Sequence, residues 1–145
     1  MKQYPGLAKP QKIKLDLLDR DLYIHLLEDT DGINQLGRSL QLEWEDYDNE
    51  LGGMFLVDDD GESHVLFNKE ILSNRIIVHE AYHAAVHLLD DVGQEFDVNN
   101  HEIYALLVEY LFSKIEAMFY GPSPKFQIHE YPGISWAQAW TAKPS

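Results

Sequence analysis

The 145-residue chain contains no cysteine, which excludes disulfides, thiolate zinc sites, iron–sulfur clusters and cysteine nucleophiles. His, Asp and Glu are the strong metal ligands that remain, so any metal is held by nitrogen and oxygen. The chain also lacks a run of about 18 apolar residues, and its start has no apolar stretch typical of a secretory signal. From these absences we expect a soluble, cytoplasmic protein that does not enter a membrane.

Positive charge is scarce as well. Eleven Lys and Arg stand against 25 Asp and Glu, which gives a net charge of −14. A field of this sign repels phosphate backbones and anionic lipids, so we expect no binding to nucleic acid. Residues 43–62 contain no Lys or Arg. Their acidic residues are Glu43, Glu45, Asp46, Asp48, Glu50, Asp58, Asp59, Asp60 and Glu62. This segment is interpreted as a solvated acidic face, or alternatively as a docking surface for a basic protein or a mimic of DNA.

The size and composition are those of one globular domain. The chain is 45% apolar and 25% charged, and it contains neither an internal repeat nor a linker rich in Pro, Gly or Ser. We therefore predict a single domain over residues 1–145.

Strand patterns occupy the first half of the chain. Ile13, Leu15 and Leu17 alternate with polar residues, which predicts a half-buried strand, whereas residues 22–27 fit a strand or a helix. Two further apolar runs surround an Asp-Gly turn and predict a β-hairpin. These runs are residues 54–57 and 64–67.

Helical patterns dominate the second half. A helix is expected from Ser73 or Asn74 to about Asp91, and because it is apolar nearly all round we expect it to be buried. A second helix is expected from about Asn100 to Phe119. The elements together predict an α+β fold, a small mixed or antiparallel sheet packed on two long helices. Farther on, Trp136 and Trp140 indicate a last helical turn that docks on the body of the protein.

The strongest chemical signal is the segment His79-Glu80-Ala81-Tyr82-His83. In a helix, residues four apart lie about 40° from each other around the axis, so both imidazoles can reach one metal ion. Glu80 lies about 60° from His83, where a carboxylate can take a proton from a metal-bound water. The spacing predicts a zinc site with Glu80 as general base. The alternative is a pair of core histidines bonded to carbonyl or carboxylate groups.

A catalytic zinc needs a third protein ligand and an open position. His87 lies two helical turns, about 12 Å, from His79, which is too far for one ion, so we expect it to support the site or to pack. Glu102, in the first turn of the second helix and beside its apolar edge, is the predicted third ligand. With Asn99 as N-cap, the same glutamate also fits a capping box, which needs no metal. The other candidate ligands are Glu109, Asp97 and His101.

The first motif, followed by Asn100-His101-Glu102-Ile103-Tyr104-Ala105, resembles the zincin metallopeptidases of the gluzincin type over about residues 72–112. In those enzymes a second, antiparallel helix supplies a glutamate ligand, and Glu102 matches it. In thermolysin-like members an aspartate four residues later supports a zinc histidine, whereas this chain has Leu106 there. The missing secretory signal and the compact second motif look more like the short intracellular or phage-encoded zincins.

The resemblance implies a zinc-dependent metallopeptidase. Zinc is then bound by His79, His83 and Glu102, and a zinc-bound water activated by Glu80 hydrolyses a peptide bond of a polypeptide substrate. In zincins a sheet edge beside the motif helix pairs with the extended substrate. The candidate edge strands are residues 54–57 and 64–67.

Two other classes of protein share these residues. One is an acidic interaction or inhibitor module, of phage type or a mimic of DNA, with a structural or vestigial zinc site. In that class a fourth protein ligand such as Asp97 or His101 closes the coordination. The other class is an amidase acting on a small amide, which differs in the shape of the pocket.

Overall fold

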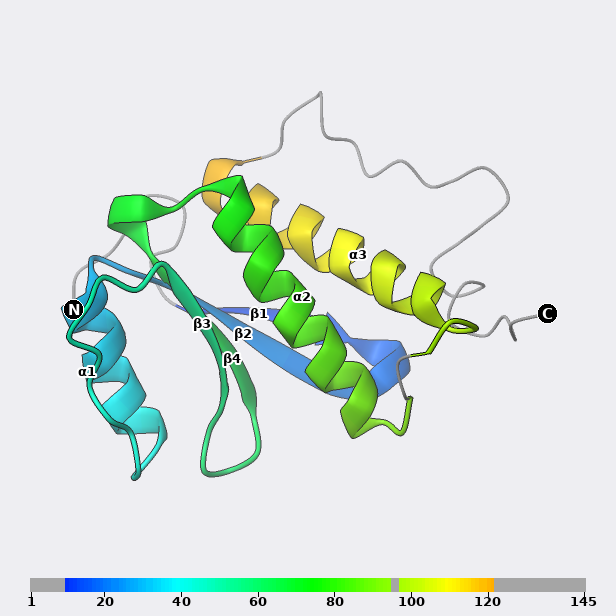
Figure 1. Cartoon of the computed structure of the whole chain (residues 1–145), viewed down its shortest axis with the longest axis horizontal. Coiled ribbons are helices and arrows are strands. Elements are labelled where there is room, and N and C mark those ends of the chain that lie inside the picture. The colour runs from blue at the N-terminus through cyan, green and yellow to red at the C-terminus, as the bar shows by residue number, and fades with distance from the viewer. Residues whose placement is uncertain (1–9, 95–96, 122–145) are drawn as a thin grey trace.

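The computed structural model describes residues 10–94 and 97–121, which form a four-stranded sheet and three helices (Figure 1). The strands are β1 (Gln11–Leu15), β2 (Arg20–Leu27), β3 (Gly53–Val57) and β4 (Ser63–Asn68). The helices are α1 (Thr30–Leu40), α2 (Asn74–Asp91) and α3 (His101–Tyr120), with short 3-10 helices η1 (Asp16–Leu18) and η2 (Lys69–Ile71). This arrangement confirms the predicted α+β class. Within these residues, none of the helices combines the length and the apolar character that crossing a bilayer requires.

The sheet is mixed, with the strand order β1-β2-β4-β3. β1 and β2 are antiparallel, β2 and β4 are parallel, and β3 and β4 are antiparallel. The β3–β4 pair is the hairpin predicted for residues 54–57 and 64–67. The edge strands of the sheet are β1 and β3, so β3 is the edge strand of the hairpin, and α2 runs beside it (Figure 1).

Each face of the sheet has its own apolar core, because successive side chains of a strand point to opposite faces. Ile24 and Phe67 point to the side of α2 and α3, where they pack with Ala81, Leu88 and Leu107. On the other face, a smaller core holds α1 against the sheet. Its buried members are Ile33, Leu56 and Leu66.

The structure decides several local questions that the sequence left open. Residues 22–27 belong to β2, since they pair with strands on both sides. The first strand ends at Leu15, and Leu17 is 46% exposed in η1, so the predicted alternation stops one step early. Helix α1 was not expected, although Asp29 as N-cap, which accepts from the Gly32 amide, and the apolar spacing from Ile33 onward are signals for it.

Helix α2 begins where the sequence predicts, with the Ser73 side chain accepting from the Ile76 amide. The prediction that this helix is buried is wrong for one of its faces. Val78 is 42% exposed and Tyr82 is 49% exposed, so an open face runs along the helix opposite the core. The helical turn predicted around Trp136 and Trp140 lies outside the described residues.

Candidate metal centre

Two imidazoles of α2 meet on its open face. The Nε2 atoms of His79 and His83 are 3.2 Å apart, and both side chains are exposed, His79 to 68%. Two nitrogens bound to one tetrahedral zinc at about 2.0–2.1 Å lie about 3.3 Å from each other. The separation of the two imidazole nitrogens therefore fits a shared zinc ion.

Glu80 lies beside this pair but faces inward. Its side chain is only 7% exposed, and its Oε1 is 3.8 Å from Nε2 of His79. Its Oε2 atom is buried and has no hydrogen-bond partner within the described residues. Burial raises the pKa of Glu80 above its ordinary value, and the nearby His79 and His83 oppose that shift. An unpaired buried carboxylate oxygen is costly, so the position of Glu80 needs an explanation other than packing.

Strand β3 lies directly against Glu80 because residue 53 is glycine. A Cβ added to Gly53 would meet Cγ of Glu80 at 2.9 Å and the Cγ2 methyl of Ile76 at 3.3 Å. The sequence contains a signal for this approach in the doublet Gly52-Gly53, which opens the strand. The close contact brings the sheet edge to the candidate metal ligands.

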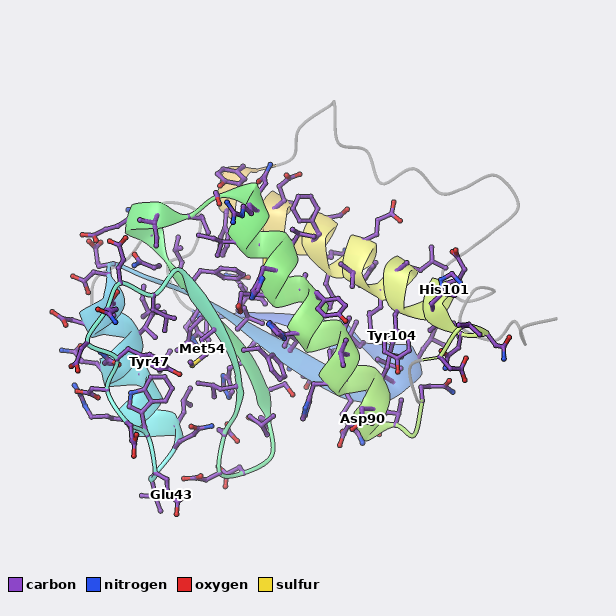
Figure 2. The ribbon with its side chains drawn as sticks, in the orientation of Figure 1. Glu43, Tyr47, Met54, Asp90, His101 and Tyr104 are labelled. Atoms are coloured by element: carbon purple, nitrogen blue, oxygen red, sulfur yellow. The ribbon has the colours of Figure 1, made fainter. Side chains whose placement is uncertain are left out.

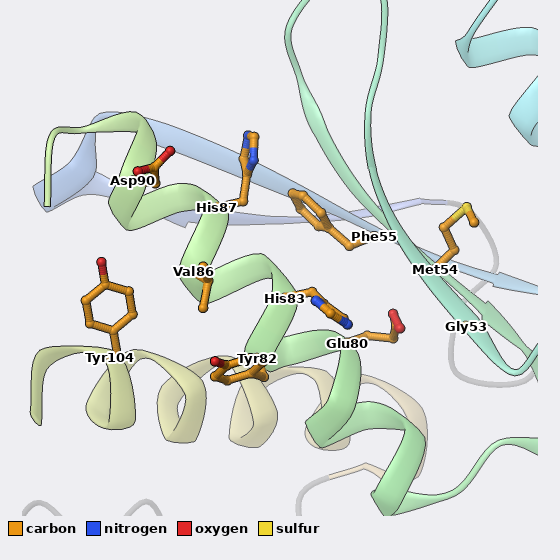
Figure 3. A pocket seen from close by; sticks show the side chains of 10 residues that line it. All are labelled: Gly53, Met54, Phe55, Glu80, Tyr82, His83, Val86, His87, Asp90 and Tyr104. Atoms are coloured by element: carbon orange, nitrogen blue, oxygen red, sulfur yellow. The ribbon is translucent and has the colours of Figure 1, made fainter. Parts of the chain in front are cut away.

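An open groove of about 600 Å³ runs between β3 and α2 (Figure 3). It is lined by Gly53, Met54, Phe55, Glu80, Tyr82, His83, Val86, His87, Asp90 and Tyr104. His83 and Glu80 point toward β3 in this view. His87 packs against the Phe55 ring with the ring centres 5.1 Å apart, which agrees with a packing role. The predicted acid–base residue and one histidine thus share a groove large enough for a peptide segment.

The predicted third ligand, Glu102, does not lie with His79 and His83. Glu102 is exposed in the first turn of α3. Within the described residues, the group of possible ligands around α2, with atoms within 4.8 Å of one another, consists of His79, Glu80 and His83. Neither Glu102 nor Glu109, which is also exposed on α3, belongs to that group.

The start of α3 differs from the predicted capping box. The N-cap is Asn100 and not Asn99, and its side chain makes no capping hydrogen bond. Instead, one Asp97 carboxylate oxygen accepts from the amides of Asn99 and Asn100, and the Asn100 side chain accepts from the Asp97 amide. The capping box of Asn99 and Glu102 is therefore absent from the described residues, and the Asp97 carboxylate organises the turn instead.

A second group of possible ligands, Asp58, Glu62 and His64, lies at the end of the hairpin. Nε2 of His64 is 2.7 Å from a carboxylate oxygen of Asp58, and Nδ1 of His64 is 2.9 Å from Nε2 of His25. If His25 donates to His64 and His64 donates to Asp58, each of these hydrogen bonds has one donor and one acceptor while both imidazoles are neutral. Burial and the nearby His64 lower the pKa of His25 to about 4. We assign this network to the structure of the hairpin.

Comparison of the chain with protein-family models, curated proteins and solved structures finds no match.

Proposed function

We propose that the protein is a zinc-dependent metallopeptidase in which His79 and His83 hold the metal and Glu80 is the catalytic base. The observation that carries this proposal is the shared geometry of the three side chains. Two exposed imidazole nitrogens are 3.2 Å apart, and beside them a buried carboxylate has one oxygen without a partner in the described residues. A pair of core histidines bonded to carbonyl or carboxylate groups does not fit side chains that lie open to solvent.

The proposed roles follow from burial, since the exposed histidines bind the metal and the buried Glu80 transfers the proton. When bound, zinc supplies Lewis acidity, which lowers the pKa of water toward 7 and polarises a carbonyl group. In the proposed reaction Glu80 accepts the proton of the attacking water and returns it to the leaving amine. Its raised pKa favours that exchange near neutral pH, because a base acts best when its pKa lies near the working pH. The open groove gives a polypeptide access to these groups.

The third ligand is proposed to be a glutamate of α3, as the resemblance implies. Glu102 is the residue that matches the zincin pattern, but the helical rise favours Glu109. His83 lies eight residues before the end of α2, and Glu109 lies eight residues after the start of α3. In two antiparallel helices with the same rise, these residues are level along the axis where the end of α2 and the start of α3 lie side by side. Tyr104, near the start of α3, and Asp90, near the end of α2, line the same groove, and Figure 2 shows both at that end of the helix pair.

The proposal is tested with protein purified without chelators. Zinc content is measured by plasma mass spectrometry, and hydrolysis is measured as new amino termini in a library of synthetic decapeptides. Glu80→Gln keeps zinc and loses about 10²- to 10⁴-fold in hydrolysis, because it removes only the proton acceptor. His83→Ala loses zinc and hydrolysis together. Release of zinc by Glu80→Gln makes Glu80 a ligand and contradicts its role as base. Wild-type protein that binds no zinc contradicts the proposal as a whole.

A further inference from the structure

The edge of β3 beside the groove is open. Gly52 accepts from the amide of Asn68, and the amide of Asp58 donates to the carbonyl of Glu62. In an antiparallel ladder, hydrogen-bonded and non-bonded pairs alternate. The even-numbered residues of β3 therefore bond to β4, and the backbone groups of the odd-numbered residues point away from the sheet.

Part of that open edge lies next to the proposed base. The Val57 carbonyl at one end accepts a hydrogen bond from the Gln41 side chain at 2.7 Å. The stretch that is left runs from Gly53 to Phe55, and Gly53 is the residue in contact with Glu80. An added strand paired with this stretch would place its backbone directly over Glu80.

Hollows flank β3 on both sides. The groove toward α2 holds about 600 Å³, and a second hollow of about 510 Å³ lies between β3 and the segment 41–47. Both are lined by Met54 and Phe55, so they meet across the strand. Side chains of a paired strand alternate between its two faces, and each face here has a hollow to receive them.

The charged residues that line the two hollows are acidic. The second hollow is lined by Glu43, Glu45 and Asp46, and the groove toward α2 by Asp90. Asp46 pairs with Arg38, whereas neither Glu43 nor Glu45 pairs with a cation in the described part of the chain. No Lys or Arg lines either hollow in that part. The lining of both hollows therefore attracts positive side chains and repels negative ones.

The segment 41–47, which carries Glu43 and Glu45, is anchored to α1. The Asn34 side chain of α1 donates to the Tyr47 carbonyl and accepts from the Tyr47 amide and from the indole of Trp44. The Trp44 ring also lies against α1 at Gly37, where an added Cβ would meet it at 2.3 Å. Glu43 and Glu45 are thus presented from an anchored segment, which reduces the entropy lost on binding.

We propose that the two hollows beside β3 select Lys- and Arg-rich polypeptide segments, which bind in extended form along β3 with their positive side chains near Glu43 and Glu45 on one side and Asp90 on the other. This inference rests on the proposed metallopeptidase function and defines its substrate class. It has two independent supports, the acidic residues that line the two hollows and the buried, unpaired Glu80 oxygen at the groove toward α2 (Figure 3).

The test uses full-length, zinc-loaded protein carrying Glu80→Gln, so that binding is measured without cleavage. The probes are fluorescein-labelled decapeptides in which pairs of Ser alternate with pairs of Lys, Gln or Glu, so that each face of an extended peptide carries the tested side chain. Their binding is followed by anisotropy at low ionic strength. We expect the Lys peptide to bind about tenfold more tightly than the Gln peptide, and the Glu peptide to bind most weakly. The advantage of the Lys peptide should fall as salt is added.

The matched variants separate local recognition from net charge. Glu43→Gln with Glu45→Gln should weaken the Lys peptide about three- to tenfold and leave the Gln peptide unchanged. Asp48→Asn with Glu50→Gln removes the same charge from the same segment but lies outside the lining of both hollows, and it should change affinity less than twofold. Equal loss in both double variants, or equal affinity for the Lys and Gln peptides, overturns the proposed selectivity.

Cleavage by wild-type protein distinguishes this inference from the function on which it rests. Preferential cleavage of the Lys peptide supports both. Cleavage of the Lys and Gln peptides with the same kcat/KM overturns the selectivity and leaves the metallopeptidase in place. Binding of the Lys peptide through Glu43 and Glu45 without cleavage of any peptide in the library overturns the enzymatic function and, with it, the role of the segment as substrate.

Discussion

Gly53 and Glu80 are in contact across the space between β3 and α2, at a distance where a single added carbon would lie 2.9 Å from Cγ of Glu80. Real Cβ atoms do not approach another atom this closely, so the strand, the glutamate or both must move when residue 53 gains a side chain. The position of the proposed base is therefore set by a residue that has no side chain.

Gly53→Ala should consequently lower hydrolysis on the order of 10²-fold while zinc binding is retained, because displacement of a catalytic group by about 1 Å has an effect of that size. Gly52→Ala is the matched control, since its added Cβ meets the flexible end of Ile76 at 2.8 Å instead of Glu80. Zinc content and kcat/KM are measured for both variants. An equal loss of activity in the two would show that the strand as a whole, and not Glu80, is disturbed.

Zinc binding should weaken as the pH falls. Because a protonated imidazole cannot ligate a metal, the zinc affinity of wild-type protein should decline as the pH falls. Equilibrium dialysis against zinc between pH 5 and pH 8 measures the change. The expected stoichiometry at neutral pH is about one zinc per chain, which His79→Ala should abolish. Affinity that is constant across this range contradicts ligation by the two histidines.

The two candidate glutamates of α3 are separated by parallel substitutions. If Glu109 is the third ligand, as the helical rise favours, Glu109→Gln weakens zinc at least about tenfold and Glu102→Gln leaves it unchanged. If the zincin pattern sets the ligand, the outcomes are reversed. Zinc titration of the two variants beside wild type decides between them. Unchanged affinity in both would direct the search to His101, since the Asp97 carboxylate is already bonded to backbone amides.

The network at the hairpin makes stability depend on pH. His25 has a pKa of about 4 in the folded protein, below its ordinary 6.5, because burial disfavours the charged imidazole. Between these values the unfolded chain binds a proton that the folded chain does not, so stability is lost as the pH falls from 6.5 to 4, by about 3 kcal/mol in total. Urea unfolding of metal-free protein at several pH values measures this slope. His25→Gln, which does not titrate, should flatten it, and an unchanged slope would assign the effect to other groups.

The anchor of the acidic segment offers a test of its rigidity. In Gly37→Ala the added Cβ would meet the Trp44 ring at 2.3 Å and push it from α1. We expect a loss of about 1–3 kcal/mol in the free energy of unfolding, as for other overpacked sites, together with weaker binding of the Lys peptide. Gly61→Ala is unsuitable as a control because of its positive φ of 88°, whereas Ser39→Ala removes only a local hydrogen bond of the same helix. Unfolding curves and peptide anisotropy are recorded for both variants.

Local features of the sequence predicted the motif helix well. Ser73 caps it, and the spacing of His79 and His83 brings their nitrogens together, because both relationships depend on a single turn of helix. The hairpin was equally predictable, since its turn and its two apolar runs are adjacent in the chain.

Features that depend on distant contacts were not predictable in the same way. Val78 and Tyr82 are apolar or aromatic, yet they face solvent, because hydrophobicity alone does not tell which side of α2 the sheet covers. The role of Gly53 required knowing that β3 lies beside α2. The choice between Glu102 and Glu109 depends on how two helices are offset along their axes, which the pattern of one helix does not determine.

An exposed strand edge also exposes a protein to self-association, since unpaired backbone groups on one copy can pair with those on another. In this chain Gln41 closes the far end of β3, and the open stretch that remains is flanked by Glu43 and Glu45. Two copies that meet edge to edge would bring these acidic flanks together, and their repulsion opposes the growth of an intermolecular sheet. The same charges that attract a basic segment thus protect the edge from aggregation, and this protection should weaken at high salt.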